Sequence, residues 1–367
     1  MKPPYTFLFL FFFMYFLWHL YLYRRIKGNY PYLPLLLILG FISPLFIRIS
    51  DLYLPPSLAF IISFAALFWM GFLFYFVVLD LILRFFLKSV FFSLSLALVL
   101  SLYSYVETLH PELIHVILYS PKIPPATTIK ILHFSDVHLG PVMGMDKVRF
   151  IEKAVQKYKP DLIISTGDFV DGNMKNKAFL QEALSRLEAP LGKYAVVGNH
   201  EYYRGIEKSI EFTTQAGFQV LRGESKEILP FLLMVGLDDD DCKYFMACKG
   251  PLKESLLLRT LPSDKFILLL KHKPRIEPEA LGFFDLMLSG HTHGGLYYPI
   301  GKWLLKALSK FEYPGWHSLV PQGYLFVSKG LGTGGPPMRL FSPPDLALIE
   351  IRAGQRAYQL FRQGLGD

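Results

Sequence analysis

Five clusters of carboxylate, imidazole and amide side chains follow one another between residues 135 and 295. Each cluster comes directly after a short apolar run, and glycines flank four of them, where the backbone must turn sharply. The clusters are Ser135-Asp136-Val137-His138-Leu139-Gly140, Gly167-Asp168-Phe169-Val170-Asp171-Gly172, Gly198-Asn199-His200-Glu201, the single His272, and Gly290-His291-Thr292-His293-Gly294-Gly295. Mixed carboxylate, imidazole and amide ligands suit Mn, Fe or Zn better than Mg or Ca. The sequence therefore predicts a transition-metal site assembled from distant segments.

The order and placement of the clusters carry this inference, because each cluster alone is weak. Asp-x-His triplets arise by chance, and Gly-Asp is common in turns. Isolated histidines, namely His115, His133 and His317, are better explained as satisfied core or surface residues. In contrast, five of the ten histidines fall in the clusters at predicted strand ends. Open α/β sheets bind their ligands at that edge.

The elements that must position these clusters predict an α/β fold. From about residue 113, short runs rich in β-branched residues alternate with amphipathic stretches. Strands are predicted over 129–134, 162–165, 194–197, 231–235, 266–270, 286–288, 324–327 and 346–351, and helices over 146–158, 177–187 and 205–216. Asp136 and His138 stand two residues apart at the end of the first run and can point the same way.

The chain before about residue 107 is almost wholly apolar. A membrane-spanning helix needs about 20 mainly apolar residues, and four windows approach this length: 5–23, 32–49, 58–78 and 90–105. Arg24 and Arg25 follow the first window, whereas a cleaved signal peptide has its positive residues before the apolar run. His19 and Asp80 lie near the window ends, so an anchor is favoured over a transporter. We therefore expect a transmembrane region of about four helices over 1–108 and a second, water-soluble domain over 109–367.

Positive residues predict the orientation of this multi-pass membrane protein. One side of the membrane receives Arg24, Arg25, Lys27, Arg84 and Lys88, and the other receives Lys2, Arg48 and Lys122. The richer side is expected to be cytoplasmic, which places the C-terminal domain outside the cytosol. The net charge of +8 is scattered and forms no basic stripe. It indicates a preference for membrane surfaces rather than nucleic acid.

The two cysteines leave two interpretations open. Cys242 and Cys248 form no CxxC motif and have no His nearby, so a zinc ribbon and a thioredoxin motif are both excluded. They form one disulfide if the domain lies outside the cytosol, or they are two unpaired thiols.

The ordered set DxH, GDxxD, GNHE, a single His and GHTHGG resembles the calcineurin-like metallophosphoesterase superfamily, and most closely its bacterial membrane-associated branch. The resemblance runs from about residue 128 to 351 and includes the tail segments 327–332 and 337–341. It departs at Leu296, where that branch usually has Gln. The resemblance implies a four-layer α/β/β/α sandwich. It also implies a dinuclear enzyme that hydrolyses a phosphate mono- or diester by a metal-bridging hydroxide.

The same resemblance assigns roles to individual residues. One metal would be held by Asp136, His138, Asp168 and His293, and the other by Asp168, Asn199, His272 and His291. The cofactors would be two divalent or trivalent ions of Mn, Fe or Zn. His200 would protonate the leaving group or stabilise the transition state, and Asp171 would orient its ring. A membrane receptor or scaffold that keeps the fold without turnover is the rival hypothesis, and the complete ligand set argues against it.

Three further segments have simpler or competing interpretations. Residues 330–335 match GxGxxG, but Pro336 and Pro337 follow, which predicts a loop rather than a dinucleotide site. The acidic run 238–241 is expected to be a solvated loop. If helical, residues 302–311 have a basic strip and an apolar face. This segment either packs on the domain's own core or lies in the membrane interface, where it would favour a phospholipid or lipid-linked substrate.

Overall fold

The computed structural model describes residues 3–26, 30–87, 89–174, 177–251, 253–297, 301, 303 and 312–364. The chain forms two compact units, each described by itself below. The helical unit comprises Met1–Val106 and Gly335–Leu340. The two-sheet unit comprises Glu107–Gly334 and Phe341–Asp367. The short segment Gly335–Leu340 thus belongs with the helices, although it is more than 200 residues away from them in the chain.

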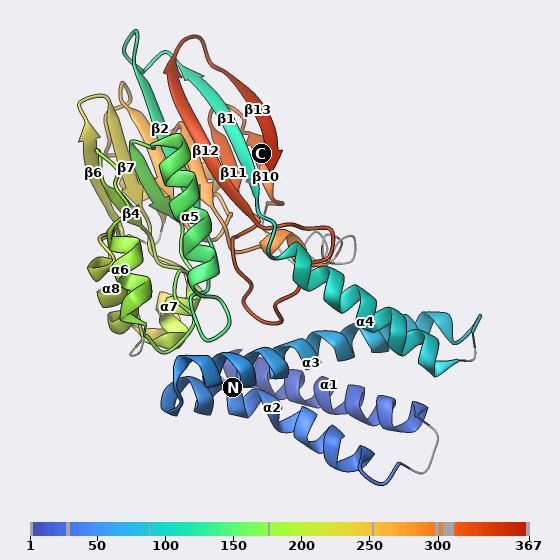
Figure 1. The fold of residues 1–367 in the computed structure, drawn as a ribbon. Helices are drawn as coiled ribbons and strands as arrows, with labels where there is room; N and C mark the ends of the chain where they lie inside the picture. Colours follow the sequence, from blue (N-terminus) through green and yellow to red (C-terminus); the bar gives the residue numbers. More distant parts are fainter. Residues whose placement is uncertain are drawn as a thin grey trace. The chain divides into compact units, whose positions relative to one another are not determined.

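Within the described ranges, four helices form the helical unit (Figure 1). They are α1 (Pro3–Arg25), α2 (Leu33–Tyr53), α3 (Pro56–Leu83) and α4 (Val90–Glu107), and each matches one predicted window to within a few residues. Among the described residues, α2, α3 and α4 are long and apolar enough to cross a membrane. The expected count of about four spans is therefore approximate, while the expectation of an N-terminal membrane region holds.

Buried polar groups in the helical unit are paired with one another. The indole Nε1 of Trp69 donates to Nε2 of His19 over 3.0 Å, and Arg25 Nε donates to Oδ2 of Asp80 over 2.6 Å. Such pairs join α1 to α3 and remove the cost of an unsatisfied polar group in an apolar environment. The backbone N–H of Arg339 donates to Ser104 O, and a Cβ on Gly71 would come within 2.4 Å of Met338 Sδ. Segment Gly335–Leu340 therefore packs closely on α3 and α4.

Two sheets make up the core of the second unit. The seven-stranded sheet has the order β13 (Ala357–Gly364), β1 (Glu112–Ser120), β12 (Asp345–Ala353), β2 (Thr128–Phe134), β3 (Leu162–Ser165), β4 (Lys193–Ala195) and β5 (Gln219–Val220). The six-stranded sheet has the order β10 (Gly315–Ser318), β11 (Tyr324–Val327), β9 (Leu286–Ser289), β8 (Phe266–Leu270), β7 (Leu232–Gly236) and β6 (Glu224–Leu229). All eight predicted strands are present. The others include the polar β6 and the exposed β13, in which apolar alternation is weak.

The layers follow from the alternation of side chains along each strand. In β2, Ile129 and Ile131 face a core between the sheets, whereas Leu132 and Phe134 face a second core under helices. Those helices are α5 (Met145–Tyr158), α6 (Ala178–Ser185) and α8 (Ile206–Gln215) (Figure 1). A third core covers the outer face of the six-stranded sheet with α10 (Glu254–Leu258) and η1 (Pro278–Ala280). The predicted four-layer α/β/β/α sandwich is thereby confirmed.

The central strands of both sheets are parallel. β2, β3 and β4 pair in parallel in one sheet, and β7, β8, β9 and β11 do so in the other. Parallel strands end at the same edge of their sheet, so the loops after them gather there. The fold therefore brings together segments that begin as far apart as residues 135 and 290.

Candidate metal centre

The predicted clusters occupy the loops that follow these parallel strands. Asp136 and His138 follow β2, Asp168 and Asp171 follow β3, and Asn199 and His200 begin α7 (Asn199–Arg204) after β4. His272 follows β8, whereas His291 and His293 follow β9. Five of these non-glycine residues have φ between 49° and 71°: Asp136, His138, Asp168, His291 and His293. Backbone strain of this kind concentrates at functional sites, because the surrounding structure must hold it.

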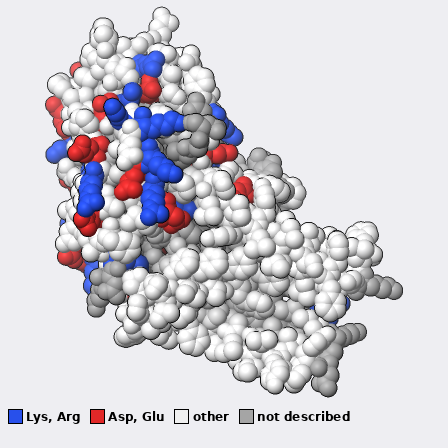
Figure 2. Space-filling view, viewed as in Figure 1, with Lys and Arg blue, Asp and Glu red and all other residues white. Residues whose placement is uncertain are grey.

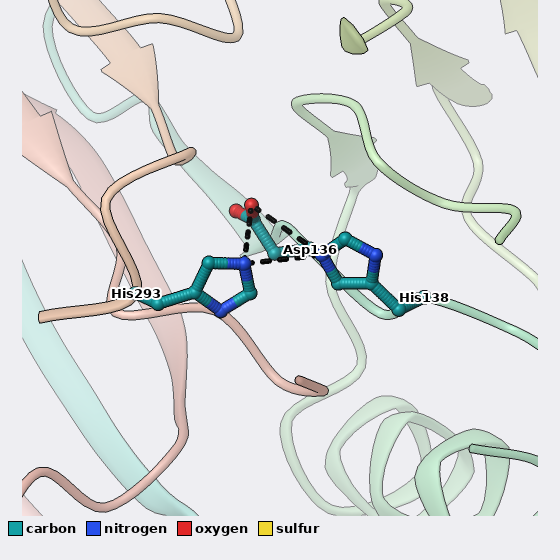
Figure 3. Close-up of side chains that lie close together, drawn as sticks. All are labelled: Asp136, His138 and His293. Atoms are coloured by element: carbon teal, nitrogen blue, oxygen red, sulfur yellow. Dashed lines mark hydrogen bonds and ion pairs between the residues drawn. The ribbon is translucent and has the colours of Figure 1, made fainter. Parts of the chain in front are cut away.

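Asp136, His138 and His293 form the first group of converging side chains. Figure 3 shows the two imidazoles and the carboxylate pointing toward one another. The Nε2 atoms of His138 and His293 lie 3.1 Å apart, and Nε2 of His293 lies 3.3 Å from Oδ1 of Asp136. Three possible ligand atoms therefore surround one point, within 4.8 Å of one another.

Asp168, His272 and His291 form a second group beside the first. Nε2 of His272 lies 3.2 Å from Oδ2 of Asp168 and 3.2 Å from Nδ1 of His291. The same Asp168 oxygen is 3.8 Å from Nε2 of His138, a member of the first group. Asp168 thus lies between the two groups, which is the position that a bridging carboxylate requires.

Two observations test whether these residues suit cations. The Nδ1 of His272 hydrogen-bonds Thr166 O over 2.8 Å, so the ring donates there and keeps a lone pair on Nε2 for the site. The Oδ1 atom of Asn199 is buried and accepts no hydrogen bond from the described residues. Burying an unsatisfied acceptor costs about 1–3 kcal/mol, a cost that a cation would relieve. The donor set fits two transition-metal ions.

Glycine and backbone N–H groups hold the two central carboxylates in place. The backbone N–H of His291 donates to Asp136 Oδ2 over 2.9 Å, and that of His200 donates to Asp168 Oδ1 over 2.9 Å. A Cβ on Gly198 would lie 2.2 Å from Asp168 Oδ1, and one on Gly290 would lie 2.1 Å from Asp136 Oδ2. Only glycine leaves room for these carboxylates.

Glu201 is a positioning residue that the sequence reasoning missed. Its buried carboxylate accepts backbone N–H groups from Asp168, Phe169, Val170 and Gly198 over 2.7–3.0 Å. It therefore ties the loop after β3 to the loop after β4. The available signal was its place in the GNHE cluster, but its partners are all backbone groups, which no residue pattern reveals.

Asp171 joins the predicted catalytic histidine to the ligand loop. Its Oδ1 accepts from Nδ1 of His200 and from Nε of Arg204, each over 2.8 Å, and its Oδ2 lies 3.4 Å from Nδ1 of His138. Burial disfavours the charged ring of His200, but the carboxylates of Asp168 and Asp171 outweigh it and raise the pKa of His200 to about 9. Burial also opposes ionisation of Asp171, yet the two histidines hold its pKa well below its usual range. The pair favours a protonated imidazole beside a carboxylate.

The loop after β11 packs against the loop after β2, which carries Asp136 and His138. The backbone N–H of Gly332 donates to Asp136 O over 2.7 Å, and a Cβ on Gly332 would come within 2.1 Å of Val137 O. No helix follows this Gly-rich segment among residues 330–344, so its predicted loop conformation is confirmed.

The acidic run 238–241 is a loop, but the prediction that it is solvated is wrong for its first two residues. Asp238 and Asp239 are 5% and 2% exposed. The Nη2 of Arg222 pairs with Asp238 over 2.8 Å, and Nζ of Lys273 pairs with Asp239 over 2.8 Å. Arg222 precedes β6 and Lys273 follows β8, and the two cations offset the cost of burying the carboxylates.

The two cysteines and the isolated histidines of the two-sheet unit all have partners within it. Cys242 and Cys248 are joined by a disulfide in this structure. The isolated histidines are structural: His115 pairs with Glu350, His133 with Thr166, and His317 with Tyr313 O. The predicted amphipathic segment 302–311 lies outside the described residues except for Trp303, which is exposed.

Comparisons with known proteins agree with the motif order. The model of the calcineurin-like phosphoesterase family matches residues 129–295. An uncharacterised metallophosphoesterase of Aquifex aeolicus is 46% identical over 257 residues, which are 70% of this chain and 98% of that protein. A transmembrane protein with metallophosphoesterase domain from Danio rerio is 26% identical, over 71% of this chain and 62% of that protein. A 5'-nucleotidase precursor from Thermus thermophilus has 14% identity and a TM-score of 0.39, over 65% of this chain and 54% of that structure.

Proposed function

Since the chain belongs to the calcineurin-like phosphoesterase family, we propose that it hydrolyses a phosphate mono- or diester with the help of two bound metal ions. The observation that carries this proposal is the position of Asp168 between two groups of ligand atoms. A single ion would need only one such group. Two groups of ligand atoms with one carboxylate between them suit a pair of ions.

The residues that would hold the metals follow from their grouping. Asp136, His138 and His293 would hold one ion, and His272, His291 and the amide oxygen of Asn199 the other, with Asp168 shared. Mn, Fe or Zn suits these ligands. When bound, such a pair activates water and offsets the negative charge of the phosphoryl group.

His200 is placed to give a proton to the leaving oxygen. Asp171 accepts from Nδ1 of His200, which leaves Nε2 as the ring atom that faces a substrate. The His200 side chain is 22% exposed, whereas the side chains of His138 and His272 are 1% and 0% exposed. A substrate can therefore reach the acid, while the side chains of His138 and His272 are shielded from bulk water.

A metal analysis with a turnover assay separates this enzyme from a non-catalytic scaffold. We expect the full chain in detergent to bind about two Mn ions and to hydrolyse bis(p-nitrophenyl) phosphate or p-nitrophenyl phosphate. Metal-free protein without turnover of either ester would favour the scaffold.

The apolar helices associate the chain with a membrane. The finer topology is part of the same proposal: residues 1–108 anchor the chain by several spans, and the catalytic domain over 109–367 lies outside the cytosol. The disulfide between Cys242 and Cys248 supports this side, because disulfides persist in oxidising compartments. The Lys and Arg distribution supports it independently. A periplasm-dependent alkaline phosphatase reporter fused to the C-terminus should be active, and activity of a cytosol-dependent reporter there would reverse the orientation.

A further inference from the structure

Aromatic side chains lie on the surface beside His200. The ring centroid of Tyr203 lies 5.5 Å from that of His200, and the ring of Phe245 lies 6.1 Å farther on from Tyr203. Tyr203 is 50% exposed and Phe245 is 43% exposed. The hydroxyl of Tyr203 donates to Asp241 Oδ2 over 2.5 Å, which fixes the ring in this position. An apolar surface thus begins directly at the proposed acid.

A cross-linked loop continues this surface. Residues 242–248 consist of α9 (Cys242–Phe245), a left-handed turn at Met246, and the disulfide that closes the loop. Its base is anchored, because Arg222 Nη2 donates to Ala247 O and the backbone N–H of Lys249 donates to Asp238 Oδ2. Its tip is exposed: Tyr244 is 58% and Met246 is 95% exposed. A cross-linked loop with large exposed apolar side chains, of which Phe245 packs against Tyr203 beside the proposed acid, indicates a ligand-binding surface.

Resting on the proposed function, we propose that Tyr203, Tyr244, Phe245 and Met246 bind an apolar leaving group, so that the substrates are phosphate esters of an apolar alcohol such as a lipid alcohol. We call these four residues the aromatic rim. We assign these residues to the leaving group and not to the rest of the substrate because His200, as the acid, must lie beside the departing oxygen. In the reaction, water forms a new bond to phosphorus, the bond from phosphorus to the alcohol oxygen breaks, and the proton of His200 goes to that oxygen.

The helical unit indicates which apolar alcohols are available to this protein. The helices α2, α3 and α4 have the composition of membrane spans, so lipid alcohols are neighbours of this protein. Aromatic and Met side chains suit long alkyl chains, because they offer large apolar area and adapt to irregular shapes.

The test compares two esters whose leaving groups differ in apolar length but have similar alkoxide basicity. The full chain in one fixed detergent concentration, loaded with Mn, is given ethyl phosphate or octyl phosphate, or their methyl diesters if only diesters react. We expect kcat/KM for the octyl ester to exceed that for the ethyl ester by roughly tenfold or more. In Phe245→Ser the ratio should fall to about 1–3, and in Met246→Ser it should fall about two- to fivefold.

Phe179→Ser provides the matched control, because Phe179 on α6 is 46% exposed and lies outside the aromatic rim. It should leave the ratio and both kcat/KM values unchanged. A ratio near one in the unmodified chain, or an equal loss for both esters in Phe245→Ser, would overturn the inference. Met246 is almost fully exposed, so its replacement keeps the test decisive if Phe245→Ser fails to fold. Absence of turnover with every ester, the nitrophenyl esters included, would instead overturn the proposed function.

Discussion

In the helical unit, large apolar side chains such as Leu36 and Phe91 are 61% and 65% exposed. In the two-sheet unit, Phe266 and Phe326 are each only 1% exposed. Figure 2 shows the matching contrast in charge: Lys, Arg, Asp and Glu gather on the two-sheet unit, and few appear on the visible face of the helices. The apolar surface of the helical unit suits a lipid environment, and the charged surface of the two-sheet unit suits water.

The two units also differ in the partners of their buried carboxylates. In the helical unit, Asp80 is fully buried, and it is paired with Arg25 and with the hydroxyl of Tyr21. In the two-sheet unit, Asp136 and Asp168 are equally buried, but they face imidazoles rather than guanidinium groups. The ion pair between Arg25 and Asp80 joins α1 to α3. The carboxylates that face imidazole nitrogens instead belong to groups of side chains that could hold added cations.

Asp168→Asn in the two-sheet unit should have the largest effect on metal binding and turnover. Replacing one carboxylate oxygen by an amide removes the shared ligand and one negative charge, so both ions should be lost and turnover should fall by at least about 10³-fold. Metals per chain and kcat on bis(p-nitrophenyl) phosphate are the measurements. Asp80→Asn is the matched control in the helical unit: it should weaken the packing of α1 on α3 yet keep both metals and turnover. Full metal occupancy in Asp168→Asn would contradict the ligand assignment.

Much of this site could be predicted from the sequence, because its residues come as ordered clusters at strand ends. The positions of Asp136, Asp168 and His291 followed from apolar runs and the residues after them. The burial of Asp238 could not be foreseen, because its partner Arg222 is 16 residues away and the two meet only through the six-stranded sheet. The return of segment Gly335–Leu340 to the helices depends on the shape around Gly71 rather than on any local pattern.

His200→Ala should have a smaller effect than Asp168→Asn, because it should lower turnover without removing the metals. No ligand atom is lost, so both metals should remain, while loss of the leaving-group acid should lower kcat by roughly 10²- to 10⁴-fold. His19 is the corresponding buried histidine of the helical unit, where it accepts from Trp69. His19→Ala should leave kcat unchanged. Retained turnover in His200→Ala, measured at saturating ester, would remove His200 from the proposed chemistry.

The smallest expected effect concerns His133, a buried histidine of the two-sheet unit without a carboxylate partner among the described residues. Its Nε2 hydrogen-bonds Thr166 Oγ1 over 2.9 Å, and its ring packs edge-on against Phe326. Complete burial disfavours the charged ring and lowers the pKa of His133 to about 3 from the ordinary 6.5. It is the opposite of His200, whose pKa is raised by neighbouring carboxylates.

The sign of the pH effect follows from these two pKa values. Above pH 6.5 the ring is neutral in the folded and the unfolded chain, so the full stability is present. Below pH 6.5 the unfolded chain takes up a proton on His133 that the folded chain does not, and stability falls by up to about 1.4 kcal/mol per pH unit until the folded pKa is reached.

The side chain in His133→Gln cannot titrate. This variant should be less stable than the unmodified chain at pH 7, and the difference should shrink by about 1 kcal/mol at pH 5.5. Denaturant unfolding of the full chain in detergent at both pH values measures this change, and His133→Asn should repeat it, since the effect depends on the lost proton and not on the shape of the replacement. Parallel stability curves for the unmodified chain and both variants would mean that His133 takes up its proton in the folded state as readily as in the unfolded one.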